Sequence, residues 1–216
     1  MNRKASVAVA AVLIATAAPV VNALDLSNVT VRARAVHLAP ADKSGAIAAL
    51  GAPADTIDVE DKWIPDLDFE YALTRHLALE LLLTIPQKHK VVARETALGD
   101  DVALGTVTHL PPTLTAKYYF GTGALKPYVG AGLNLTWFVD DDLGVAGVGT
   151  LDVDNWSIGP ALQAGVDVKL NPRWSLSFDA KRAWIRTDVS LGGTKLTKVK
   201  VDPWIVGAGV GYRLGN

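Results

Sequence analysis

Hydrophobic and polar positions alternate along most of the chain. In the stretch NWSIGPALQAGVDVKLNPRWSLSFDAKRAW (residues 155–184), every second residue from Trp156 to Leu170 is apolar or proline, and the residues between are polar or small. A turn sequence follows at residues 171–173, and the alternation then starts again. Because successive side chains of a β-strand point to opposite faces, this period of two predicts a pair of strands joined as a hairpin.

The same alternation occurs in six further segments, so that the pattern predicts eight strands in all. The further segments are residues 29–35, 66–73, 79–85, 114–120, 129–137 and 204–214. The connections are alternately short (74–76, 121–126 and 171–173) and long (38–62, 87–107, 140–155 and 189–198). Short turns at one end and long loops at the other are typical of an outer-membrane barrel, although soluble barrels can also have eight strands.

The direction of the apolar side chains separates a membrane barrel from a soluble one. In the last segment, Gly207, Gly209 and Gly211 share a face with Arg213, and the opposite face carries larger apolar residues such as Val206. The interior of an eight-stranded barrel has room for few large side chains. Small and charged residues inside, with bulky apolar residues outside, favour a barrel that is surrounded by lipid.

Aromatic residues recur at a spacing that fits a membrane. Trp174 and Trp184 are ten residues apart on one face, and Trp204 and Tyr212 are eight apart on one face. In tilted strands these spacings span on the order of 20–25 Å, which is the height of the apolar band, and aromatic residues favour its two edges. We therefore predict an all-β fold, an eight-stranded antiparallel transmembrane β-barrel of the outer membrane, with these four residues in its aromatic belts.

Composition and charge agree with an exported barrel. The 216 residues are 50% hydrophobic and include no cysteine, and no run of apolar residues after Leu24 is long enough for a membrane helix. Arg3 and Lys4 precede a short apolar stretch, which predicts a signal peptide over residues 1–23 and a single barrel domain over residues 24–216. Removing these two basic residues leaves 19 of the 21 against 22 acidic ones, so we expect no nucleic-acid partner.

Four segments resemble the outer membrane protein W family. They are HLPPTLTAKYYFG (109–121), KPYVGAGLN (126–134), VDPW (201–204) and GAGVGYRL (207–214). The resemblance implies an eight-stranded barrel of Gram-negative outer membranes, with periplasmic termini and extracellular long loops, from a family associated with the passage of small hydrophobic molecules. The partners it implies are outer-membrane lipid, lipopolysaccharide, small hydrophobic solutes and the barrel insertion machinery.

The inward positions carry charges of both signs. They are Arg32, Arg34, Asp66, Asp68, Glu70, Glu80, Lys117, Asp179, Lys181 and Arg213. A charge in a narrow interior needs a partner. We therefore expect four of the basic residues, Arg213 among them, to pair with four acidic ones and plug the lower barrel. The alternative is a polar lumen that conducts ions.

Four prolines fall towards the outer ends of the second, third and fourth strands. They are Pro65, Pro86, Pro111 and Pro112. Proline lacks an amide donor and interrupts a strand ladder. One interpretation is a weakened lateral seam, through which an apolar solute leaves the upper lumen sideways into the membrane; the other is that these prolines only end the strands.

The long connections contain apolar stretches, such as SGAIAALGAPADTI in the first. Folded over the mouth of the barrel, they would form an apolar funnel, for which Ile47, Leu50 and Trp156 are the candidate residues. The other interpretation is an ordinary surface loop. Trp156 is also the first outward residue of its own strand pattern, which directs it to lipid instead.

No catalytic constellation stands out in the sequence, and we expect neither enzyme activity nor a cofactor or metal. His89 and His109 flank the second long connection, but two histidines without a third ligand are weak support for a metal site. The primary hypothesis is a barrel that passively admits small hydrophobic molecules through an apolar upper lumen, with lateral release into the membrane. The alternatives are a closed structural or adhesive barrel that displays its loops to partners, phage or bacteriocins, and a barrel enzyme acting on outer-membrane lipids.

Overall fold

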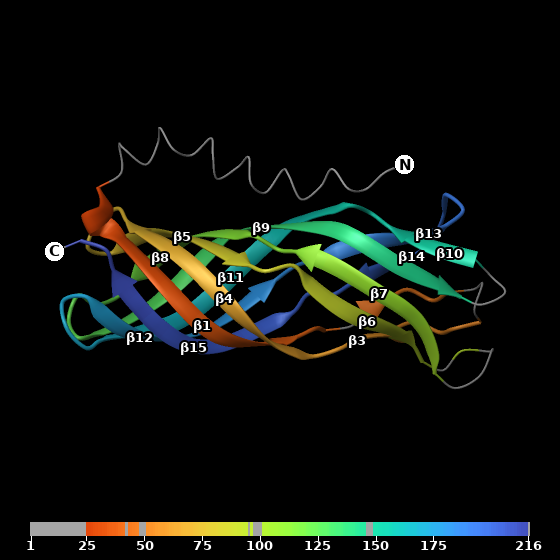
Figure 1. The fold of residues 1–216 in the computed structure, drawn as a ribbon, viewed down its shortest axis with the longest axis horizontal. Helices are drawn as coiled ribbons and strands as arrows, with labels where there is room; N and C mark the ends of the chain where they lie inside the picture. Colours follow the sequence, from red (N-terminus) through yellow and green to blue (C-terminus); the bar gives the residue numbers. More distant parts are fainter. Residues whose placement is uncertain are drawn as a thin grey trace.

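The computed structural model describes residues 25–41, 43–47, 51–94, 96, 101–145 and 149–215. The expected signal peptide, and Leu50 of the expected funnel, lie outside these residues. The described chain forms an elongated β-barrel, and residue 25 and the C-terminal segment lie at the same end of it (Figure 1). Within the described ranges, no helix is long and apolar enough to cross a membrane.

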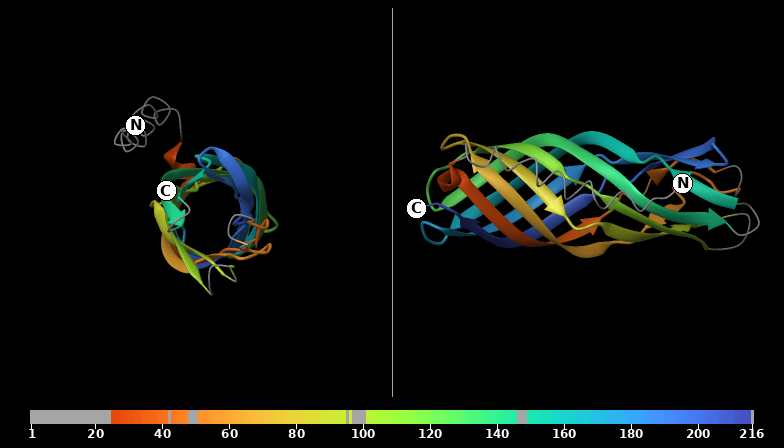
Figure 2. Two further views of the ribbon diagram at one scale, coloured as in Figure 1. Left: turned by 90° about the vertical axis from the view of Figure 1, so that its right-hand side faces the viewer. Right: turned by 45° about the horizontal axis from the view of Figure 1, so that its top comes forward.

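Eight long strands close into a ring, which Figure 2 shows end-on. Each strand pairs antiparallel with the next, β9 pairs with β11, and β15 returns to β1. The predicted eight-stranded antiparallel barrel is therefore confirmed. The strands are β1 (Val29–Ala39), β4 (Lys62–Ala72), β5 (Leu77–Thr84), β8 (Thr113–Tyr119), β9 (Leu125–Val145), β11 (Trp156–Lys169), β12 (Trp174–Ala183) and β15 (Trp204–Arg213).

The three short turns lie at the same end as the 3-10 helix Leu26–Asn28 and the last residues of β15, here called the turn end. The turn between β4 and β5 is closed by Thr74, whose Oγ1 accepts from the amides of His76 and Leu77. Asn171 closes the turn between β11 and β12 in the same way, because its Oδ1 accepts from the amides of Arg173 and Trp174. Such local side-chain acceptors fix a tight turn.

At the opposite end, here called the hairpin end, the long connections are strands rather than irregular loops. Together with the upper half of β9, they pair in the order β3-β6-β7-β9-β10-β13-β14-β2 and extend the barrel wall. The prediction of long loops was wrong in this respect. The added strands are β2 (Lys43–Ser44), β3 (Ile57–Val59), β6 (Gln87–Ala93), β7 (Val102–Leu110), β10 (Gly149–Val153), β13 (Arg186–Leu191) and β14 (Thr194–Lys200).

In the eight spanning strands, large apolar side chains point outward. On β5, Leu79, Leu81 and Leu83 are each 39% exposed, whereas Glu80 between them is fully buried inside the barrel. A strand that exposes leucine and buries glutamate is stable only where the surrounding solvent is apolar. This part of the barrel is therefore the membrane-spanning section.

In the extension formed by the added strands, the polarity is reversed. On β6, Lys88 and Lys90 are exposed, whereas His89 and Val91 are buried. The inward residues of the extension form an apolar core that includes Ile57, as in a soluble β-barrel. The extension therefore stands in a polar environment beyond the apolar band of the membrane.

Aromatic side chains mark both edges of the outward apolar surface. At the turn end, the Trp174 and Tyr212 rings meet edge to face, with centroids 4.8 Å apart. At the other edge, the Trp137 and Trp156 rings stack 5.3 Å apart. Trp204 also lies at this edge, opposite Arg182 in the sheet register.

Candidate functional site: a lumen divided by polarity

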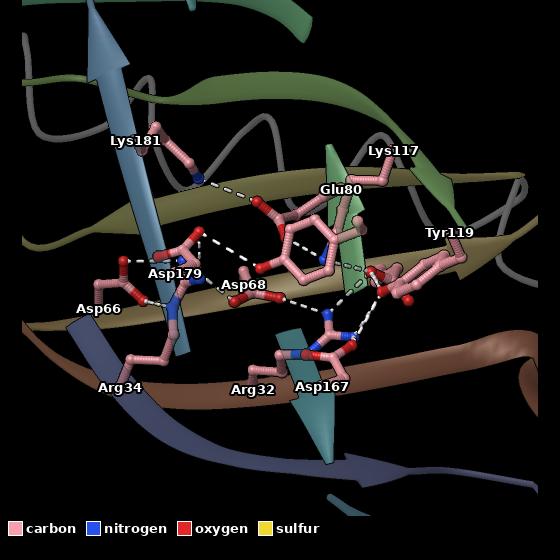
Figure 3. Close-up of polar contacts among 12 residues, drawn as sticks. Arg32, Arg34, Asp66, Asp68, Glu80, Lys117, Tyr119, Asp167, Asp179 and Lys181 are labelled. Atoms are coloured by element: carbon pink, nitrogen blue, oxygen red, sulfur yellow. Dashed lines mark hydrogen bonds and ion pairs between the residues drawn. The ribbon is translucent and has the colours of Figure 1, made fainter. Parts of the chain in front are cut away.

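The lumen of the spanning section contains a network of buried ion pairs. Arg32 of β1 lies 3.1 Å from Asp68, 3.0 Å from Glu70 and 2.8 Å from Asp167. These carboxylates come from β4 and from β11 on the far side of the ring, so the guanidinium crosses the lumen (Figure 3). Arg32 is only 2% exposed, and its delocalised charge suits several carboxylates at once.

Arg34 lies two residues further along β1, on the same inward face, and repeats this arrangement. Its guanidinium lies 3.0 Å from Asp66, 3.2 Å from Asp68 and 3.1 Å from Asp179. Asp68 therefore bridges the two arginines, and Asp179 connects Arg34 to β12 (Figure 3).

Glu80 of β5 holds the remaining two cations. Its two oxygens lie 3.0 Å from Lys117 Nζ and 2.9 Å from Lys181 Nζ, and Lys117 is also 2.7 Å from Glu70. None of these side chains is more than 7% exposed. Strands β1, β4, β5, β8, β11 and β12 are thus joined through one set of charges in the lumen.

The observed network differs from the ten expected inward charges at two positions. Arg213 is not part of it: this last residue of β15 is exposed, and its Nε donates to the Ser27 carbonyl oxygen at 2.6 Å. It shares the inward face, but lies at the mouth of the barrel, where water can solvate it. Asp167 is part of the network and was missed, although it lies on the inward face of its strand, opposite that of Trp156.

Two tyrosines, Tyr119 and Tyr128, complete the network. Tyr119 Oη donates to Glu70 at 2.7 Å. Tyr128 stands inside the barrel at 2% exposure, and Lys117 Nζ lies 3.7 Å from the centre of its ring. Tyr128 is therefore a lumen residue, which accounts for its position out of phase with the outward belts.

Glycines on the inward face make room for the arginines. A Cβ atom at Gly209 would lie 2.5 Å from Arg34 Cγ and 2.2 Å from the Ala33 carbonyl oxygen. At Gly211 it would lie 3.1 Å from Arg32 Cγ. The glycine face of β15 thus leaves room for the two arginine side chains of the neighbouring strand.

Inside the extension, the lumen is apolar. A cavity of about 50 Å³ lies there, and the described residues that line it include no Asp, Glu, Lys or Arg. The lining residues are Ile57, Val59, His89, Val91, Val107, His109, Phe138, Leu143, Val153, Ile185, Thr187, Val189, Val199 and Val201. A second cavity of about 30 Å³ shares Val91 and Leu143 with it. We call the two together the apolar chamber.

The expected funnel residues have different positions. Ile47 is 4% exposed and lines the smaller cavity of the chamber. Trp156 does not face the lumen: it is 53% exposed and stacks on Trp137 at the outer surface. The prediction for Trp156 was therefore wrong, because the outward register of its own strand determines its direction.

The barrel wall has a break in its ladder beside three of the four prolines. The pairing of β5 with β8 ends at Leu82 and Thr113, and the wall resumes where β6 pairs with β7 at Gln87 and His109. Residues 85–86 and 111–112, which include Pro86, Pro111 and Pro112, belong to no strand. Pro65 lies within β4, opposite Ala35 of β1.

Two histidines stack in the chamber, next to Phe138. The rings of His89 and His109 are 5.1 Å apart and nearly parallel, at 18°. Both belong to the extension strands, and burial lowers the pKa of each, that of His109 to about 3. Both rings are therefore neutral at physiological pH. Among the described residues, no three His, Asp, Glu or Cys side chains are grouped so that they could hold a metal ion.

Comparison with known proteins agrees with this architecture. A sequence model of the OmpW family matches residues 26–214. The chain is 38% identical to the outer-membrane protein y4mB of Sinorhizobium fredii, covering 88% of this chain and 82% of that protein. It is 40% identical to outer membrane protein W of Escherichia coli, covering 68% and 71%. The crystal structure of OprG from Pseudomonas aeruginosa superimposes with a TM-score of 0.71 at 30% identity, covering 85% and 94%.

Proposed function

The chain belongs to the OmpW family and is a β-barrel of the bacterial outer membrane; from this premise, we propose that it passively admits small hydrophobic molecules through the apolar chamber. The reversal of lumen polarity carries the proposal. Transfer of an apolar solute from water into a cavity lined by Ile, Val and Leu lowers its free energy. Transfer from water into the ion-paired lumen of the spanning section does not. The chamber therefore favours solutes that the spanning lumen disfavours.

The orientation follows from the two ends of the barrel. Short turns of outer-membrane barrels lie in the periplasm and long connections lie outside. We therefore place the turn end and both termini in the periplasm, and the extension at the cell surface. Exposed lysines of the extension, such as Lys88 and Lys90, then lie where lipopolysaccharide phosphates could contact them.

The route from the chamber is lateral. Passage straight through the barrel would require the solute to separate buried charges such as Arg32 and Asp68, at a cost of several kcal/mol. The break in the ladder at Pro86, Pro111 and Pro112 instead leaves the wall with fewer hydrogen bonds just below the chamber. A solute that leaves here enters the apolar band of the membrane directly.

Uptake measurements with proline variants test this route. The double variant Pro111→Ala/Pro112→Ala restores two backbone amides that could extend the ladder between β5 and β8. We expect toluene uptake by bacteria that express this variant to be several-fold slower than with the wild-type barrel. Pro172→Ala, in a turn at the far end, is the matched control and should leave uptake unchanged. Normal uptake by a folded double variant would contradict the lateral route.

A closed barrel that displays its hairpins is the second candidate function, because the ion network fills the lower lumen. It predicts that cells with and without the wild-type barrel take up toluene at the same rate. A clear difference between these two strains would exclude a purely structural role.

A further inference from the structure

Among the described residues that line the larger cavity of the chamber, one fully buried side-chain polar atom has no hydrogen-bond partner. His89, on the inward face of β6, is 1% exposed. Its Nδ1 lies 3.1 Å from the carbonyl oxygen of Glu60. A carbonyl oxygen can only accept a hydrogen bond, so the proton of the neutral ring must be on Nδ1. The other nitrogen, Nε2, then carries a free lone pair.

This lone pair is buried and unsatisfied. Nε2 of His89 has no hydrogen-bond partner among the described residues. The hydroxyl of Thr187, another lining residue, already donates a hydrogen bond to the Asp154 carbonyl oxygen at 3.4 Å. Buried acceptors without a donor are rare and unfavourable, because the group has lost its water and gained nothing in return. A ligand that brings a donor into the chamber would remove this penalty.

The surroundings of His89 define the rest of the ligand. The His109 ring stacks on one side of it, with Phe138 5.9 Å from His109. The other lining residues are mainly aliphatic, and none is charged at neutral pH. An anion would have to be buried there without a cation, which is strongly unfavourable. At about 50 and 30 Å³, the two cavities are smaller than the roughly 150 Å³ of an engineered cavity that binds benzene, so the chamber must widen to admit even a molecule of one ring.

We propose that the apolar chamber selects small apolar molecules that carry one hydroxyl donor, such as phenols and alcohols, by a hydrogen bond to His89 Nε2. The inference rests on the proposed function, since it requires the chamber to be the solute site, and it adds the chemical class of the solute. Hydrocarbons lack the donor, and carboxylates lack it and carry a charge. Phenols satisfy both the wall and the acceptor.

Matched ligands test the proposal on the full barrel in lipid nanodiscs. The probes are p-cresol, toluene, which lacks the oxygen, and 4-methylanisole, which has the oxygen but no donor. Titrations followed by tryptophan fluorescence, corrected with empty nanodiscs for partitioning into lipid, give the affinities. Because a net hydrogen bond changes affinity by about two- to tenfold, we expect p-cresol to bind up to about tenfold more tightly than both other probes.

The variant His89→Phe keeps an aromatic ring beside His109 and removes the acceptor. It should bind p-cresol and toluene equally, whereas the control His37→Phe, at an outward histidine of β1 that does not line the chamber, should keep the preference for p-cresol. Should His89→Phe not fold, the ¹⁵N resonance of His89 Nε2 in the wild-type barrel provides the test, since it should shift on addition of p-cresol and not of toluene.

Equal binding of p-cresol and toluene by the wild-type barrel, or an unshifted Nε2 resonance, would overturn the selection by His89 and leave the proposed function standing. If neither probe bound above the level of empty nanodiscs, the chamber would not be a solute site, and the proposed function would fail as well.

Discussion

Replacing Glu80 by glutamine tests how the lumen charges stabilise the barrel. The substitution keeps the size of a fully buried side chain and removes its negative charge. Lys117 keeps a second carboxylate, Glu70, at 2.7 Å. Lys181 has Glu80 as its one ion-pair partner among the described residues, and it is 1% exposed. The variant therefore leaves one ammonium group buried beside a neutral amide.

The magnitude follows from this unpaired charge. Breaking a buried ion pair by removing one partner costs about 3–5 kcal/mol, and since the amide oxygen of glutamine can still accept a hydrogen bond, we expect about 3 kcal/mol. Lys181→Met removes the cation itself while Glu80 keeps Lys117, so it should cost about 1 kcal/mol. Adding Lys181→Met to Glu80→Gln should then recover about 2 kcal/mol.

A surface pair provides the control. Lys195 lies 2.5 Å from Asp188 in the extension, with side chains that are 54% and 28% exposed. Lys195→Met should cost no more than about 1 kcal/mol, because water screens exposed pairs.

Urea titrations of tryptophan fluorescence in lipid vesicles give the free energies of unfolding, and heat-modifiable gel mobility identifies the folded fraction. Equal losses for Glu80→Gln and Lys195→Met would refute the reasoning. So would a double variant no more stable than Glu80→Gln alone, since it would mean that the unpaired ammonium is not the cause of the loss.

Three further perturbations have defined outcomes. Gly209→Ala should lower the free energy of unfolding by about 1–3 kcal/mol, because its Cβ would overlap Arg34, whereas Gly123→Ala, which meets nothing within 4 Å, should be close to neutral in the same urea titration. The pKa of His109 is lowered from 6.5 to about 3, so the unfolded chain binds a proton below pH 6.5 that the folded barrel does not. The free energy of unfolding should therefore fall by about 1 kcal/mol more between pH 6.5 and 5.5 in the wild-type barrel than in His109→Phe. Finally, Trp156→Ala should leave p-cresol affinity unchanged in the nanodisc titration, because its side chain is on the outer surface. Weaker binding by this variant would contradict that position and indicate that Trp156 faces the lumen.

Strand alternation predicted the spanning section because each strand there keeps its apolar side chains outward and its polar or small residues inward over many residues. A single inward register is enough to direct Arg32, Asp68, Glu80 and Lys181 into the barrel. Asp167 follows the same alternation and lies on the inward face of its strand. It was overlooked because a glycine and a glutamine precede it on that face. Which carboxylate meets which cation depends on how strands are staggered around the ring, and alternation along one strand carries no such information.

The extension could not be predicted in the same way, because its strands point their charged side chains outward and their apolar side chains inward. In QKHKVVA the charged residues point outward and the inward positions mix Gln87, His89 and Val91, so the segment looks like a polar loop to a search for apolar outward faces. The acceptor at His89 was equally hidden, since it depends on a contact with the backbone of Glu60, 29 residues away in the chain.

The ion network also has a consequence for the permeability of the whole cell envelope. Four cations and six carboxylates from strands around the ring are joined across the spanning lumen. A hydrated salt ion or a charged antibiotic would have to separate these pairs to pass through the lumen. The proposed lateral path leads into lipid, where a polar compound would lose its hydration. With the function proposed above, a bacterium would be able to insert many copies of this barrel, and widen its supply of apolar nutrients, without opening a path for ions or charged drugs.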